Sequence, residues 1–196
     1  WFGFADSMKF HIPVMPGSWI NLEDIRMITG FDVKGRGSIE ALVTSFYENP
    51  VITGTFNGTA CNFDGFDAES CNLSISMKEF VLNLKINEVK QRTVSSKNSL
   101  VSLDFNPTPI KVTFLINDAK GSVKDAAGVF GLNADSFTGQ VSLNAEGMFQ
   151  DDLKRLSGTL KGENIKKMKG EKIADSVLIK VVDRDKTVQL EKGVIT

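Results

Sequence analysis

Apolar and polar residues alternate along most of the chain with a period of two. In residues 38–46, Ile39, Ala41 and Val43 fall on one side of the alternation, and mostly polar residues fall on the other. This period is typical of a strand with one buried and one solvated face. The same pattern predicts further strands over 51–58, 73–77, 80–86, 101–105, 112–116, 141–145, 177–182 and 188–190.

Residues that favour turns separate these segments at short and fairly even intervals. They occur at 35–37, 48–50, 64–65, 96–98, 106–109 and Gly158. Short strands at even spacing predict an all-β sandwich, barrel or solenoid.

Two segments have some helical character. Ser122 and Gly131 suit the start and the end of a short helix within 122–133. The segment 153–168 also has helical spacing, but Gly158 and Gly162 disfavour a long helix there.

An internal repeat is the most informative feature of the sequence. The segment VITGTFNG at Val51–Gly58 recurs as RLSGTLKG at Arg155–Gly162, and an alternating strand precedes each copy. The repeat predicts two related units, at about 35–105 and 137–196, within one β-repeat segment spanning 1–196. Repeated units of this kind indicate an extended β structure in which each unit packs on its neighbour.

The run from Lys34 to Phe66 resembles the repeats of the AsmA-like superfamily, and of its TamB-like members in particular. The resemblance lies in the turn Asn49-Pro50, the strand Ile52–Gly58 with its spaced glycines, and the turn Phe63-Asp64-Gly65. The second copy departs from this pattern, because it has Asp151-Asp152 in place of Asn-Pro. About a third of the chain carries the resemblance clearly.

The resemblance implies a curled, taco-like sheet of antiparallel strands with an apolar inner face. It also implies a segment of an inner-membrane-anchored envelope protein in the bacterial periplasm. Such proteins are implicated in phospholipid transport to the outer membrane and in outer-membrane assembly, so phospholipid acyl chains and an outer-membrane assembly partner are the expected partners. The alternation selects these residues as the lining of a lipid groove: Ile39, Ala41, Val43, Ile52, Phe56, Leu82, Leu84, Val141 and Leu143.

Composition changes this picture little. The chain has a formal net charge of −1, and its basic cluster at 161–172 is diluted by glutamates, so we expect no nucleic-acid partner. Its 14 Phe against one Tyr suit either a dry core or an apolar groove. No stretch approaches the ~20 apolar residues of a membrane-spanning helix. Since the chain opens with Trp1, we expect it to be part of a longer protein.

The two cysteines leave two readings open. Cys61 and Cys71 flank a turn near Gly65, which would set their thiols at equivalent heights on facing strands. They would then form a disulfide in an oxidising compartment, or remain two buried free thiols in a reducing one. Their spacing matches no zinc site.

The sequence contains no catalytic constellation, so we expect a non-enzymatic protein without cofactor or metal. His11 is the single imidazole, and no residue pattern pairs it with a nucleophile. Carboxylate pairs occur at Glu23-Asp24, Asp151-Asp152 and Asp183/Asp185, but nothing distinguishes one pair as an acid and base.

Two alternatives share the same strand pattern. One is a closed barrel or sandwich that binds a small apolar ligand, and the other is a structural or adhesive β-module. An open sheet would leave two unpaired edges, so we also expect this chain to self-associate through strand pairing.

Overall fold

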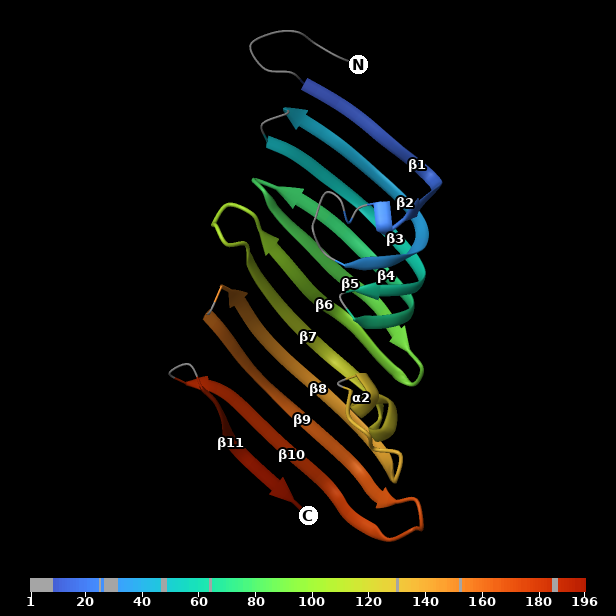
Figure 1. Cartoon of the computed structure of the whole chain (residues 1–196), viewed down its shortest axis with the longest axis vertical. Coiled ribbons are helices and arrows are strands. Elements are labelled where there is room, and N and C mark those ends of the chain that lie inside the picture. The colour runs from blue at the N-terminus through green and yellow to red at the C-terminus, as the bar shows by residue number, and fades with distance from the viewer. Residues whose placement is uncertain are drawn as a thin grey trace.

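The structure is a computed structural model that describes residues 9–24, 26, 32–46, 49–63, 65–129, 131–151, 153–184 and 187–196. Within these residues eleven strands form one antiparallel sheet, and each strand pairs with its neighbours in sequence (Figure 1). The strands are β1 (Lys9–Asn21), β2 (Val33–Phe46), β3 (Asn49–Phe63), β4 (Phe66–Lys78), β5 (Val81–Gln91), β6 (Val94–Asp104), β7 (Lys111–Ser122), β8 (Phe137–Gln150), β9 (Leu153–Lys167), β10 (Lys172–Arg184) and β11 (Thr187–Ile195).

The prediction of an all-β fold with a curled sheet is confirmed, and the alternative of a closed barrel or sandwich is wrong. β1 and β11 lie at opposite ends of the sheet, and the sheet order does not join them (Figure 1). At 4.7–4.9 Å per strand, eleven strands extend about 48 Å along the sheet. A meander of this kind needs only short connections, because each hairpin returns directly beside the strand before it.

One face of the sheet is apolar across nine consecutive strands. Residues that face each other in antiparallel strands share a face, so the register defines rows of side chains. One row on this face runs from β1 to β9 through Val14, Ala41, Gly54, Ile75, Leu84, Val101, Phe114, Gly147 and Leu156. The adjacent row on the opposite face is mostly polar: Pro13, Leu42, Thr53, Ser76, Asn83, Ser102, Thr113, Met148 and Arg155. We call the first the inner face and the second the outer face.

Several strands carry a β-bulge, and these bulges bend the sheet. The register shifts between Lys34 and Arg36 in β2 and between Ile116 and Ala119 in β7, with further shifts in β1, β4, β8 and β10. Asn98 in β6 has a positive φ of 53°, in the left-handed region, and it lies in the stretch between Ser95 and Leu100 where β6 has no paired residues in β7. Because a bulge bends its strand and increases the local twist, successive bulges curl the sheet.

Asparagine side chains join neighbouring strands along the outer face of this bend. The Asn72 amide donates to the Asn57 side-chain oxygen, and the Asn87 amide donates to the Asn72 oxygen at 2.7 Å. Further along, the Asn117 amide donates to the carbonyl of Asn98 at 2.9 Å. The bond from Asn87 to Asn72 lies at the register shift between β4 and β5, whereas Asn72 and Asn57 are directly paired residues of an uninterrupted ladder.

The buried core lies in the curled end of the sheet, which comprises the part of β2–β4 near the β3–β4 turn. Figure 1 shows these strand ends turning out of the plane of the remaining sheet. Leu22 is inserted there from the segment after β1, and its backbone N–H donates to the Gly35 carbonyl at 2.8 Å. The buried cluster contains Leu22, Phe56, Cys61, Ala68, Cys71 and Leu73.

The short helix α2 (Val123–Val129) lies against the ends of β7 and β8 (Figure 1). The Ser122 hydroxyl oxygen accepts a hydrogen bond from the Asp125 N–H at 3.1 Å, so the expected N-cap at Ser122 is confirmed. The segment 153–168, by contrast, forms β9 and no helix.

The two copies of the sequence repeat occupy equivalent positions in two hairpins. Gly54 of the first copy faces Ala41 across the β2–β3 pair, and Gly158 of the second faces Ala145 across the β8–β9 pair. A Cβ added to Gly54 would lie 2.8 Å from the Cβ of Ala41. The glycine of the repeat therefore makes room for the alanine of the preceding strand on the inner face.

Phe56 and Phe149 lie on the same inner face, but only Phe56 is in the core. Their exposed fractions are 3% and 39%. We expect Phe56→Ala to lower the free energy of unfolding by about 3–5 kcal/mol, because it leaves a cavity among buried side chains. Phe149→Ala should cost about 1 kcal/mol or less. Urea denaturation of both variants checks this, and equal losses would contradict a core confined to the curled end.

Candidate functional site

The open part of the inner face is the main candidate for a binding site. The register places all nine sequence-selected residues on this face. Seven of them lie in three rows of facing residues. One row contains Ile39 and Phe56, the second contains Ala41 and Leu84, and the third contains Val43, Ile52 and Leu82. Val141 and Leu143 lie on the same face of β8.

Eight of these nine residues are half-buried, and the exception is Phe56. Its ring is 3% exposed within the buried cluster of the curled end, so it belongs to the core and not to the open face. Alternation identifies the face of a residue, but it contains no information about which part of that face is covered.

Sequence reasoning missed an aromatic pair on the open face. The rings of Phe114 and Phe149 are stacked with their centroids 5.6 Å apart and an interplanar angle of 22°. A Cβ on Gly147 would lie 2.4 Å from the Phe114 ring, so this ring covers the glycine of the neighbouring strand. Both aromatic residues follow the same alternation as the nine selected ones, and that signal could have identified them.

The inner face combines large apolar side chains with an absence of charge along its central row. The row from Val14 to Leu156 has no ionisable residue, and Ile12, Phe149 and Leu156 are 50%, 39% and 36% exposed. Within the described part of the chain, only Leu103 and Ala174 are buried hydrophobic residues outside the curled-end cluster. Most of the apolar face is therefore in contact with solvent, which is unusual for a folded domain.

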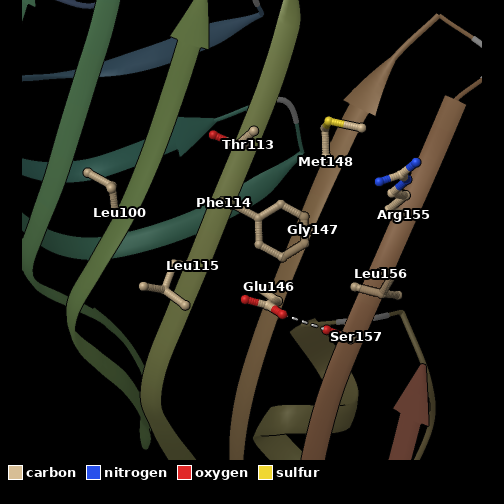
Figure 2. A pocket seen from close by; sticks show the side chains of 10 residues that line it. All are labelled: Leu100, Thr113, Phe114, Leu115, Glu146, Gly147, Met148, Arg155, Leu156 and Ser157. Carbon is tan, nitrogen blue, oxygen red and sulfur yellow. Dashed lines mark hydrogen bonds between the residues drawn. The ribbon is translucent and has the colours of Figure 1, made fainter. Parts of the chain in front are cut away.

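The outer face has a depression of about 510 Å³ across β6–β9 (Figure 2). Leu100 faces Leu115 at its apolar side, and the Ser157 hydroxyl donates to the Glu146 carboxylate at 3.0 Å on the other. Arg155, Met148 and Thr113 of the outer face also line it, together with Phe114, Gly147 and Leu156 of the inner-face row.

The two cysteines lie together inside the curled end. Their Sγ atoms are 3.9 Å apart, and both thiols are free and buried. The expected facing arrangement is wrong in detail, because Cys61 faces Ala68 and Cys71 faces Gly58. In both strands the alternation of buried and exposed residues shifts by one residue at this point, between Gly58 and Cys61 in β3 and between Ala68 and Cys71 in β4. Ala60 has a φ of 50° there, and the shift turns the Cys61 side chain toward Cys71.

Burial shifts the acidity of both thiols in the same direction. Desolvation raises the pKa of Cys61, and it raises the pKa of Cys71 to about 12 with a further contribution from Cys61. Both groups are therefore protonated thiols at neutral pH, and a protonated thiol is a poor nucleophile.

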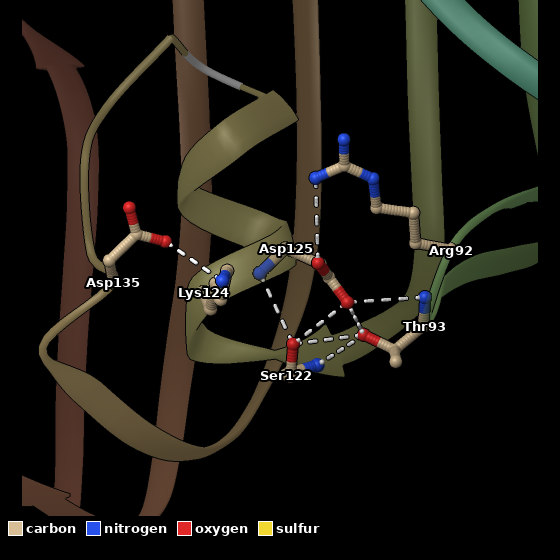
Figure 3. Close-up of polar contacts among 6 residues, drawn as sticks. All are labelled: Arg92, Thr93, Ser122, Lys124, Asp125 and Asp135. Carbon is tan, nitrogen blue, oxygen red and sulfur yellow. Dashed lines mark hydrogen bonds and ion pairs between the residues drawn. The ribbon is translucent and has the colours of Figure 1, made fainter. Parts of the chain in front are cut away.

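A polar cluster joins α2 to the turn between β5 and β6 (Figure 3). The Thr93 hydroxyl donates to the Asp125 carboxylate at 2.5 Å, the Ser122 hydroxyl donates to it at 3.0 Å, and Arg92 pairs with it at 3.8 Å. The Thr93 hydrogen bond is the main reason why the pKa of Asp125 is lowered. These groups bind the carboxylate of a residue in the first turn of α2, so the cluster positions α2 against the sheet.

The remaining ionisable candidates do not converge. His11 is exposed, and Glu23 accepts a hydrogen bond from the Gly35 N–H at 3.3 Å. Asp64, Asp152 and Asp185 lie outside the described residues. No group of three or more metal-ligating side chains occurs in the part of the chain that the structure describes. Among the same residues, no helix is long and apolar enough to span a membrane.

Comparison of the chain with family models, with curated proteins and with solved structures gave no match.

The Cys71 thiol should make the stability of the reduced protein depend on alkaline pH. Below pH 9 the thiol is protonated in both states, so its shifted pKa has no effect. Between pH 9 and about 12 only the unfolded state ionises, so stability falls by up to about 1.4 kcal/mol per pH unit. Urea midpoints between pH 8 and 10.5 should fall less steeply for Cys71→Ala than for the reduced wild type, and parallel curves would contradict the shift.

Proposed function

We propose that the chain is a non-enzymatic β-groove segment that binds phospholipid acyl chains on its inner face. The observation that supports this most directly is the continuous apolar row across nine strands, without a second layer over most of it. Apolar surface in water carries a cost of about 25 cal/mol per Å², and covering it with an apolar ligand recovers that free energy.

The chemistry of an acyl chain suits a face of this kind. Each buried CH₂ group contributes about 0.8 kcal/mol, and the chain presents no donor or acceptor that a particular residue must recognise. A row of aliphatic side chains is therefore sufficient, and the groove needs no sharp sequence motif. Val101 and Phe114 illustrate this, since they face each other on β6 and β7 in the middle of the row.

The resemblance to AsmA-like and TamB-like repeats suggests the cellular setting. In this proposal the chain is a periplasmic segment of an inner-membrane-anchored envelope protein that acts in phospholipid transport and outer-membrane biogenesis. The spaced glycines that support the resemblance have a structural role that fits it. Gly54 and Gly158 each admit an alanine of the preceding strand, so the inner face stays smooth along the sheet.

Lipid binding is tested by native mass spectrometry and lipid extraction after expression of the chain in a bacterial periplasm. We expect phospholipid to co-purify with the wild type. Leu84→Asp and Leu143→Asp should each reduce the bound lipid at least about tenfold, because a carboxylate on the inner face must be desolvated when an acyl chain covers it.

The matched control is Asn83→Asp, which places the same charge on the outer face of the same strand. It should retain lipid at the wild-type level, and circular dichroism should show that all three variants keep their strand content. Lipid loss in Asn83→Asp as well, or a folded wild type without any lipid, would contradict the proposal. The second outcome would favour a structural or adhesive β-module.

Self-association through strand edges belongs to the same proposal. β1 contains Pro13 and Pro16, which lack the N–H that an added strand requires, whereas β11 contains no proline. We therefore expect pairing at β11. The Ser176–Thr196 pair exchanges backbone hydrogen bonds, so the alternation directs the Ile195 N–H toward the open edge.

Sedimentation velocity over a concentration series tests this edge. We expect the wild type to form dimers at high concentration, and Ile195→Pro should weaken this association at least about tenfold by removing one edge donor. Val194→Ala is the control, since it keeps every backbone N–H. A wild type that stays monomeric at the highest concentration would exclude association through the edges.

A further inference from the structure

The paired thiols in the curled end are a site that the proposed lipid groove does not use. Cys61 and Cys71 come from adjacent strands, and their Sγ atoms lie 3.9 Å apart with exposed fractions of 2% and 5%. A disulfide joins its sulfurs at about 2.0 Å, so the two Sγ atoms must move closer together. Because Cys61 faces Ala68 and Cys71 faces Gly58, the backbone of the hairpin must also move for the bond to form.

Gly58 provides the space that the two sulfurs occupy. It faces Cys71 across the β3–β4 pair, and a Cβ at this position would lie 2.5 Å from the Cys61 sulfur and 2.9 Å from the Cys71 sulfur. The absence of a side chain at Gly58 therefore leaves room for both sulfurs. The one-residue shift at Ala60 turns Cys61 into the same space.

We propose that Cys61 and Cys71 form a thiol pair that is oxidised to an intramolecular disulfide across the β3–β4 hairpin by a small disulfide such as oxidised glutathione. The inference rests on the geometry of the pair and is independent of lipid binding.

The reaction proceeds in two thiol–disulfide exchanges. One cysteine thiolate attacks a sulfur of glutathione disulfide, which forms a mixed disulfide and releases one glutathione thiolate. The second cysteine thiolate attacks the protein sulfur of that mixed disulfide, which forms the Cys61–Cys71 bond and releases the second glutathione. The two protein thiols lose two protons and two electrons, and the glutathione disulfide takes up both as two thiols.

Burial makes this exchange depend on opening of the hairpin. Desolvation raises the pKa of Cys71 to about 12 and raises that of Cys61, so little thiolate exists in the closed hairpin at neutral pH. Attack requires a thiolate and access for the glutathione molecule. The pair is thus unreactive while the curled end is closed, and the bond, once formed, is protected in the same place.

The test is a redox titration of the full chain in glutathione buffers, with and without 8 M urea, followed by acid quench and intact mass spectrometry. We expect a product 2 Da lighter than the reduced chain, and an oxidised-to-reduced ratio at least about tenfold higher in the folded protein than in urea. Oxidation should also raise the Tm by about 5–10 °C. An equal or lower ratio in the folded state, or glutathione adducts in place of the internal bond, would overturn the proposal.

Two glycine variants separate the geometry of the site from general crowding. Gly58→Ala places its Cβ between the two sulfurs, so its folded-state ratio should fall toward the value in urea. Gly54 lies in the same strand as Gly58, but an added Cβ there meets Glu40 and Ala41 of β2 and neither sulfur, so Gly54→Ala should keep the wild-type ratio. Circular dichroism confirms folding before titration, and the wild-type comparison decides the question if either variant fails to fold.

Discussion

The structure depends on one constraint, which is that a sheet with a single apolar face has no second layer of its own to cover it. Within the residues that the structure describes, every strand belongs to this one sheet and pairs with its sequence neighbours, so no strand forms a second layer over the inner face. The sheet covers part of its own apolar face by bending. Its β2–β4 end curls and, together with Leu22, forms the buried cluster, and α2 covers the ends of β7 and β8.

The bend is encoded by residues that sequence reasoning assigned to turns. The segments 35–37 and 96–98 and Gly158 were expected to separate strands, but each lies within one. Gly35 lies at a register shift with a φ of 116°, and Asn98 has a φ of 53°. Several turn types and some β-bulges use left-handed backbone, so they favour the same residue types. Local sequence therefore does not distinguish a turn from a bulge. At Gly35 the chain continues as a strand because β2 pairs with β1 on one side and with β3 on the other.

The sequence was sufficient for the fold class, for the positions of most strands and for the face on which the nine selected residues lie. Alternation carries this information because direct pairing keeps Ala41, Gly54 and Leu84 in one row. It could not separate buried Phe56 from open Phe149, because coverage depends on which part of the sheet curls. The close approach of the Cys61 and Cys71 sulfurs could not be predicted either, since it requires a one-residue shift in the buried–exposed alternation of β3 and β4.

An uncovered apolar face also couples stability to ligand binding. Among the described residues, six of the eight buried hydrophobic side chains lie in the curled-end cluster, so the open strands β5–β10 bury only part of their apolar surface. A ligand that covers the inner face of the folded sheet, and has no comparable surface in the unfolded chain, stabilises the fold by mass action. For an acyl chain the gain grows with each methylene group that leaves water. The property that leaves the open strands poorly buried is therefore the same property on which the proposed binding of an apolar partner rests.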